Sequence, residues 1–328
     1  MAATQPLPES AGPDRLFRAE PYDYAEVRRI AAELDLAEPV AVALVRRGYR
    51  TVAQASEFLD AREEHDPFAF EGMEEACERL LARARAGARI TIHGDYDVDG
   101  VCATTILVST LRELGAACDW LIPDRLGGGY GLTPAGVEEL GRRGTEVVVT
   151  VDCGIGSVEE VAAARAAGLE VIVTDHHTPP ERLPDCPILH PVVSGYPFTG
   201  LCAAGVAHKL ALALRHSAGQ RAVETVAGAR APGEEDLDLV ALATVADLVP
   251  LVGENRRLVR RGLSVMRASP RPGMRALIAS AKVEAESLDE GALGFRLAPR
   301  INAVGRLYRA DAAVELMLTD DEPRAAEI

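Results

Sequence analysis

One short loop of the sequence contains four acidic or imidazole side chains. Residues 92–100 read Ile-His-Gly-Asp-Tyr-Asp-Val-Asp-Gly, so His93, Asp95, Asp97 and Asp99 follow a strand-like apolar run almost directly. Carboxylates held a few Å apart repel one another and raise one another's pKa unless a cation lies among them. Oxygen-rich clusters of this kind suit hard cations such as Mg²⁺ and Mn²⁺. The loop therefore predicts a metal site.

Two further strand-like segments end in the same kinds of residue. Asp152 follows Val-Thr-Val, and Asp175, His176 and His177 follow Val-Thr. A single aspartate at a strand end is often a helix cap, but three strands that end this way favour a shared site. Aspartates and histidines without thiolates can hold two divalent ions about 3.5 to 4 Å apart, which is an arrangement for phosphoester hydrolysis. Asp247 ends an apolar helix-like run, and its pattern fits a cap or surface charge as well as a ligand.

Alternating apolar segments predict the elements that position these residues. Such alternation indicates an α/β fold with a mainly parallel sheet, right-handed crossovers and flanking helices on both faces. In open sheets of this type, the chemistry lies beyond the carboxyl ends of the strands. The pattern predicts strands over 89–93, 117–122, 146–151, 169–174 and 187–191, with helices over 99–114, 133–143 and 157–167 between them.

Helical patterns precede and follow the alternating region. They predict helices over 24–34, 38–48, 51–60 and 72–86, and a helical C-terminal half over 202–216, 236–249, 254–268, 272–281 and 310–318. Pro323 suits the first turn of one more helix. We expect a flexible lead-in over 1–22, a helical segment over 23–87, the main domain over 88–320, and over 321–328 the start of a helix that leads into a longer chain.

Composition limits the classes of function. The chain has 35 basic and 50 acidic residues and a formal charge of −15, which argues against non-specific adhesion to a polyanion. The six cysteines form no Cys-x-x-Cys pair that would suggest zinc or a redox couple. The sequence has no apolar run of the roughly 20 residues that span a bilayer and no signal-peptide pattern, so we expect no membrane association and a cytoplasmic location.

The motifs taken together resemble those of the DHH phosphoesterase superfamily, and within it the RecJ-type exonucleases, which degrade single-stranded DNA in the 5′→3′ direction. The resemblance covers most of residues 40–320. Its motifs are His-Gly-Asp-Tyr-Asp-Val-Asp-Gly (93–100), Gly-Tyr-Gly-Leu (129–132), Val-Asp-Cys-Gly (151–154), Asp-His-His (175–177), Ala-Thr-Val-Ala-Asp (243–247) and Pro-Arg-Ile-Asn-Ala-Val-Gly-Arg (299–306).

This resemblance implies a site for two Mn²⁺ or Mg²⁺ ions. Its ligands would come from the strand-end motifs and from the acid at the end of the later helical run. The implied assignment gives one ion to His93 and Asp97 with Asp95 close by, the other ion to Asp99, His176 and Asp247, and the bridging position to Asp152.

The resemblance also implies groups that act on the substrate. His177 would contact the phosphate or act as general acid, and Asp152 and Asp99 would be catalytic through the metals. Arg300 and Arg306 lie in an Arg-rich stretch, and guanidinium forks bind phosphate in a bidentate manner. Tyr130, in a Gly-rich loop, fits equally a residue that stacks on a base and part of a simple crossover loop.

The implied function is that of a metal-dependent phosphodiesterase, an exodeoxyribonuclease of DNA repair and recombination that releases 5′-mononucleotides. Single-stranded DNA would be its substrate, with a single-stranded-DNA-binding protein and a helicase as partners by resemblance. Two alternatives stay open: a DHH enzyme that acts on short oligonucleotides or cyclic dinucleotides, and a DHH scaffold without catalysis.

Overall fold

The computed structural model describes residues 21–123, 131–219, 233–268, 270–307 and 311–328, without the side chains of 305–307. The chain divides into two compact units, residues 1–62 and 63–328. The first unit contains α1 (Tyr24–Glu33), α2 (Glu38–Arg46) and α3 (Val52–Asp60). These helices enclose a small core of their own, as their predicted amphipathic pattern requires. The core residues are Val27, Ile30, Ala41, Leu44, Val45 and Ala55.

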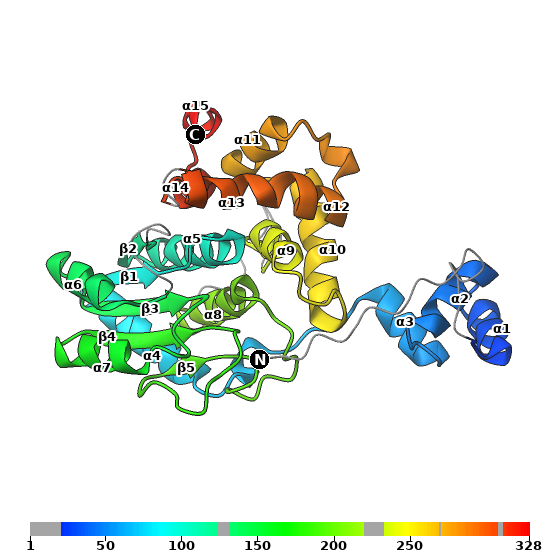
Figure 1. Ribbon diagram of the computed structural model, residues 1–328, viewed down its shortest axis with the longest axis horizontal. Helices are drawn as coiled ribbons and strands as arrows, with labels where there is room; N and C mark the ends of the chain where they lie inside the picture. The colour runs from blue at the N-terminus through cyan, green and yellow to red at the C-terminus, as the bar shows by residue number, and fades with distance from the viewer. Residues whose placement is uncertain (1–20, 124–130, 220–232, 269, 308–310) are drawn as a thin grey trace, which may run out of the picture. The chain divides into compact units, whose positions relative to one another are not determined.

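The second unit is built on a five-stranded parallel sheet (Figure 1). Its strands lie in the order β2-β1-β3-β4-β5. All five strands predicted from the alternating pattern are present, so the α/β fold class is confirmed. Their bounds are β1 Arg89–His93, β2 Ala117–Leu121, β3 Val147–Val151, β4 Glu170–Thr174 and β5 Ile188–Leu189.

Alternate residues of the central strands face two separate cores. Val147 and Val149 of β3 belong to the larger core, whereas Val148 between them belongs to the smaller one. A strand that is buried on both faces reads as a continuous apolar run, which explains the Val-Val-Val sequence. Around the sheet pack η2 (Pro67–Ala69), α4 (Met73–Arg85), α5 (Val98–Glu113), α6 (Pro134–Arg142), α7 (Val158–Ala166) and α8 (Ala203–Ser217).

The C-terminal half is helical, as predicted, but it contains helical stretches over 285–287 and 290–307 that the sequence pattern did not predict. A π-helical turn, η4 (Leu293–Leu297), continues directly into α13 (Ala298–Leu307). Pro299 is the second residue of α13 and comes directly after the π-helical turn. The other elements are α9 (Leu237–Ala246), α10 (Gly253–Ala268), α11 (Pro272–Ser280), η3 (Ala285–Ser287), α12 (Glu290–Ala292), α14 (Asp311–Leu318) and α15 (Glu322–Glu327).

Candidate metal centre

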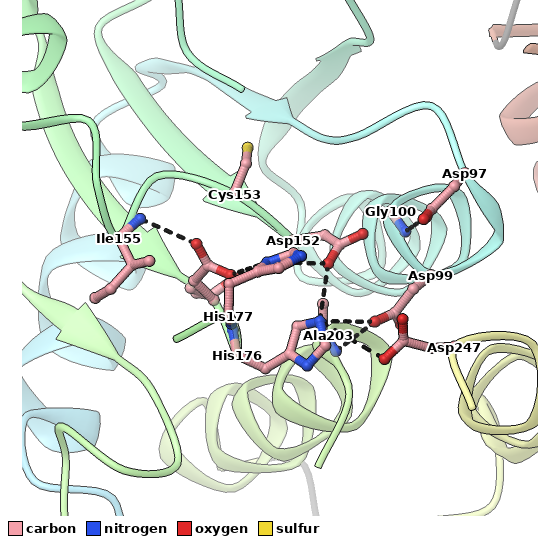
Figure 2. A network of polar contacts seen from close by, with 12 residues as sticks. Asp97, Asp99, Gly100, Asp152, Cys153, Ile155, His176, His177, Ala203 and Asp247 are labelled. Atoms are coloured by element: carbon pink, nitrogen blue, oxygen red, sulfur yellow. Dashed lines mark hydrogen bonds and ion pairs between the residues drawn. The ribbon is translucent and has the colours of Figure 1, made fainter. Parts of the chain in front are cut away.

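The predicted acids and histidines gather beyond the carboxyl ends of β1, β3 and β4. His93 is the last residue of β1, Asp152 follows β3 directly, and Asp175 follows β4 directly. Because β3 pairs with both β1 and β4 in parallel, the three strand ends lie side by side. Helix α9 adds Asp247 from the other side, so the side chains form one cluster (Figure 2).

Within the described residues, three groups of side chains have ligand atoms close enough together to hold a metal ion. In each group the ligand atoms lie within 4.8 Å of one another. Asp152 and His176 each belong to two groups, so the three groups are linked rather than separate. The groups are Asp95, Asp97 and Asp152; Asp152, His176 and His177; and Asp99, His176 and Asp247.

His176 lies at the middle of the cluster, where Figure 2 shows it between three carboxylates. Its Nε2 atom is 3.2 Å from Asp152 Oδ1, 3.5 Å from Asp99 Oδ2 and 3.8 Å from Asp247 Oδ2. This nitrogen is buried and makes no hydrogen bond to any described residue. A divalent cation would give the buried imidazole nitrogen the partner that it lacks and would neutralise the carboxylates around it. The donor set therefore fits hard or borderline divalent metals.

Without a cation, the ionised forms of the clustered carboxyl groups are unfavourable, and the pKa values of these groups are raised. Burial, and then the neighbouring Asp99 and Asp97, raise the pKa of Asp152 well above its usual value. Burial also raises the pKa of Asp99, and burial together with Asp99 raises the pKa of Asp247 to about 6. Since all three carboxyl groups resist ionisation in the same small volume, a bound cation would stabilise the ionised forms.

Hydrogen bonds from backbone amides hold two of the acidic side chains, those of Asp97 and Asp99, in place. Asp97 is the N-cap of α5, and its Oδ1 atom accepts a hydrogen bond of 3.0 Å from the amide of Gly100. Asp99 accepts hydrogen bonds from the first amides of α8, with its Oδ2 atom 2.7 Å from Ala203 N and its Oδ1 atom 2.8 Å from Ala204 N. Helix α8 has no side-chain cap of its own, so Asp99 caps it across the fold and is held in one orientation.

His177 is held by Asp175, a strand-end carboxylate to which the sequence interpretation gave no individual role. Asp175 Oδ1 lies 2.8 Å from His177 Nδ1, and Asp175 Oδ2 accepts a hydrogen bond of 3.0 Å from the amide of Ile155. The hydrogen bond to Asp175 raises the pKa of His177. Although burial opposes it, the hydrogen bond from His177 and the one from Ile155 keep the pKa of Asp175 below its usual value. The Asp-His-His motif places Asp175 two residues before His177 in the sequence. Only the structure shows that Asp175 orients the His177 ring.

His93 belongs to none of the three groups of candidate ligands. It is 1% exposed, and its Nδ1 atom is 3.9 Å from the sulfur of Cys153. Burial lowers the pKa of His93 to about 4, so the ring is neutral at pH 7. Its implied role as a metal ligand stays a prediction.

Asn302 is a second residue that the sequence interpretation did not assign. Its Oδ1 atom accepts a hydrogen bond of 3.1 Å from the amide of Val98. Val98 lies between Asp97 and Asp99, so α13 supports the loop that carries two of the candidate ligands. The only sequence signal was the position of Asn302 within the Pro-Arg-Ile-Asn motif.

The predicted phosphate-binding residues are not part of these groups. Arg300 is exposed, contacts the carbonyl of Arg296 and lines a cavity of about 840 Å³ between α11, α13, α14 and α15. No contact between Arg300 and the acids is present among the described residues. Tyr130 and the side chain of Arg306 lie outside the described residues.

Comparisons with known proteins agree with this geometry. Residues 89–244 match the model of the DHH family, N-terminal domain. A single-stranded-DNA-specific exonuclease RecJ from Bacillus subtilis (strain 168) is 40% identical over 93% of the chain and 38% of its own length. The RecJ exonuclease of Escherichia coli (strain K12) is 43% identical over 76% of the chain and 44% of its own length. The chain thus spans less than half of either relative.

The similarity extends to solved structures. The crystal structure of RecJ in complex with Mn²⁺ from Thermus thermophilus superposes with a TM-score of 0.78 at 36% identity, covering 93% of this chain and 42% of that chain. A structure of RecJ from the same organism in complex with Mg²⁺ gives a TM-score of 0.69 at 33% identity, covering 93% and 39%. The fold, the strand-end acids and these matches together show that residues 89–244 match the N-terminal domain of the DHH family and that the chain is similar to part of the RecJ exonucleases.

Proposed function

We propose that this chain is the catalytic part of a two-metal-ion phosphodiesterase that degrades single-stranded DNA from the 5′ end. The observation that carries the proposal is the linked set of three ligand groups, in which Asp152 and His176 are shared. Sharing of this kind suits two adjacent divalent ions, because one residue can then contact both. The relatives named as single-stranded-DNA-specific exonucleases, and the Mn²⁺ and Mg²⁺ complexes of similar structures, support both the metal and the substrate.

The residues that would hold the two ions are those of the linked groups. Asp95, Asp97 and Asp152 would hold one ion, and Asp99, His176 and Asp247 the other, with Asp152 within reach of both. When bound, such ions lower the pKa of a water molecule and offset the negative charge that develops on a phosphoryl group. The backbone amides of α8 keep Asp99 in place, so little reorganisation is needed when substrate arrives.

His177 is the residue of the cluster best suited to move a proton. Its Nδ1 atom faces Asp175, its side chain is 46% exposed, and its ring stays next to Asp152. Because Asp175 favours the protonated ring, His177 can donate a proton to the leaving 3′ oxygen of the cleaved phosphodiester.

The setting of the activity follows from the resemblance and the composition. The described part of the chain contains no helix that is both long and apolar enough to cross a membrane. We propose a cytoplasmic location, a DHH domain over 88–320, and a single-stranded-DNA-binding protein and a helicase as partners. With a formal charge of −15, contact with DNA has to be local, which fits a strand end held at the metals.

The test is Mn²⁺-dependent digestion of single-stranded DNA labelled at one end. Wild type is expected to release 5′-mononucleotides from an open 5′ end and to spare a strand whose 5′ end is blocked. Asp152→Ala should lose the activity, whereas Asp185→Ala, at a carboxylate whose side chain is 97% exposed, should keep it. Equal activity of Asp152→Ala and wild type would overturn the proposal. Hydrolysis of cyclic dinucleotides without digestion of strands would show a different DHH enzyme.

A further inference from the structure

A buried histidine lies directly after β5, and the sequence pattern gave it no role. His190 follows β5 as Asp175 follows β4. Leu189 of β5 is the parallel partner of Thr174 of β4, so His190 and Asp175 leave the sheet at the same edge. His190 is 0% exposed. A further strand of the sheet therefore brings an imidazole to the edge at which the acids gather.

Both ring nitrogens of His190 have hydrogen-bond partners. Nε2 lies 2.7 Å from the carbonyl oxygen of His177. Nδ1 accepts hydrogen bonds of 3.1 Å from the amide of Val192 and 3.3 Å from the amide of Val193. Because a carbonyl oxygen can only accept and an amide can only donate, Nε2 carries the ring hydrogen and Nδ1 carries a lone pair. The ring thus joins the loop after β5 to the backbone of His177 in one defined tautomer.

The carbonyl of His177 cannot find a donor in the turn that follows it. The residues two and three positions further along are Pro179 and Pro180, and proline has no backbone N–H group. Neither residue can close a turn back to this carbonyl. A backbone carbonyl that is withdrawn from water requires a donor from elsewhere in the fold. His190 supplies that donor from 13 residues away.

The bond from His190 completes the immobilisation of His177. Asp175 Oδ1 already accepts hydrogen bonds from the amide of His177, at 3.1 Å, and from its Nδ1 atom, at 2.8 Å. The amide belongs to the peptide group before the Cα atom of His177, and the carbonyl belongs to the peptide group after it. Peptide groups are planar, so fixing both of them fixes the two backbone dihedral angles between them. The direction of the His177 side chain is then fixed as well.

We infer that His190 is a positioning residue that holds the His177 ring in place through the His177 carbonyl. The inference rests on the proposed function, in which His177 gives a proton to the leaving oxygen. His190 itself is buried, and both of its ring nitrogens are engaged, so it acts only through His177. A displacement of about 1 Å at a reacting group can lower a rate by about 10²-fold. Proton transfer belongs to the transition state, so the loss should appear in kcat rather than in KM.

Two amide substitutions separate the two sides of the His190 ring. The side chain in His190→Gln is long enough to place an N–H group near the position of Nε2 and to keep the bond to His177. The shorter side chain in His190→Asn can place an oxygen only near the position of Nδ1, so it keeps the bonds to the loop alone. The measurements are kcat and KM for Mn²⁺-dependent digestion of 5′-phosphorylated oligo(dT), together with urea unfolding.

His190→Asn is expected to lower kcat by about 10- to 10²-fold with little change in KM, and His190→Gln should keep most of kcat. The control is Ser194→Ala, which removes a hydroxyl that donates to the carbonyl of Ile188 in the same loop. This variant should keep kcat whatever its free energy of unfolding. Equal kcat in His190→Asn and wild type would overturn the inference. Equal losses in all three variants would also overturn it, because His190 would then only support the loop.

A spectroscopic measurement tests the positioning without catalysis. Correlation spectra of the histidine ring nitrogens in the metal-free chain should show, in wild type, a ring in the Nε2–H tautomer whose signals disappear in both His190 variants. The ring signals of His177 should shift more in His190→Asn than in His190→Gln, and unchanged signals in His190→Asn would contradict the inference. Failure of the proposed function would be distinguishable, as the absence of DNA digestion by wild type whatever the spectra show.

Discussion

The Nδ1 atom of His177 lies 2.8 Å from the Oδ1 atom of Asp175, and this contact sets both the orientation and the protonation of the imidazole. The same carboxylate oxygen also accepts a hydrogen bond of 3.1 Å from the amide of His177, so the ring and its own backbone are held together. Asp175 is 1% exposed, and water therefore competes little for its oxygens. The ring of His177 is therefore held in one orientation, which suits the proton-donor role proposed for it.

We expect Asp175→Asn to move the alkaline limb of the pH–rate profile to lower pH. Asp175 raises the pKa of His177, and activity that needs the protonated ring is lost as pH rises through that pKa. A neutral acceptor holds the proton less tightly, so the loss should begin at lower pH, and kcat at pH 8 should fall by about 10²-fold. The measurement is kcat against pH at saturating Mn²⁺, with Asp185→Asn as the control. Superimposable profiles for Asp175→Asn and wild type would contradict the prediction.

Asp152→Asn is expected to stabilise the metal-free chain against unfolding. It should also reduce the additional stability that the chain gains from Mn²⁺. Burial and neighbouring carboxylates make ionised Asp152 costly at neutral pH, and asparagine tolerates the φ of 62° found there. The free energy of unfolding in EDTA should rise by about 1 kcal/mol. The gain should shrink as pH falls, because the wild-type carboxyl then becomes protonated. Urea unfolding in EDTA and in Mn²⁺ measures both effects, and a variant less stable than wild type in EDTA would disprove the first.

Mn²⁺ affinity should fall as the pH is lowered from about 8 to about 5. A carboxyl group must lose its proton to bind metal, and the pKa of Asp247 is about 6 in the metal-free chain. Binding near that pH should therefore release protons into the buffer. Titration calorimetry in two buffers with different ionisation enthalpies counts them, and Asp247→Asn should release fewer. The same proton count for both chains would show that Asp247 does not titrate on binding.

Asn302→Ala is expected to weaken Mn²⁺ binding by about 10- to 100-fold without removing a ligand, because partners that orient ligands have effects of this size. The Asn302 side chain holds the amide of Val98 between two candidate ligands. Asn302→Asp keeps an oxygen acceptor for this amide and should retain more of the affinity than Asn302→Ala. Calorimetric titration with Mn²⁺ requires no catalysis and so isolates the positioning role. Equal affinity in Asn302→Ala and wild type would rule that role out.

His208 should make the fold sensitive to acid. It is buried in α8, and burial, followed by the charge of Lys209, lowers its pKa to about 3. Because the unfolded chain takes up this proton more readily below pH 6.5, stability is lost as pH falls through that range, by about 2 kcal/mol at pH 5. His208→Leu should lose less stability than wild type between pH 7 and pH 5 in urea unfolding. An identical loss in both chains would assign the acid sensitivity to other groups.

Local patterns were sufficient for most of the fold. The continuous valines of β3, the turn residues and the alternation with amphipathic helices predicted every strand and the parallel arrangement, because burial on both faces leaves that signature in the sequence. The unpredicted helix over 298–307 shows where local reasoning fails. No helical pattern was assigned to this stretch, and the structure shows that it continues directly from the preceding π-helical turn.

By itself the sequence determined that His176, Asp152 and the acids after β1 would meet, since parallel strands bring their carboxyl ends to one edge. The residue pattern left Asp247 open and the resemblance implied that it joins them, which is where the structure places it. Only the tertiary structure decided that Asp99 caps α8 more than 100 residues further along, and that Asn302 supports Val98 from 204 residues away. Contacts between residues so far apart in the chain depend on how helices pack against the sheet. Packing of that kind depends on the shape of the whole core, which no local pattern of residues specifies.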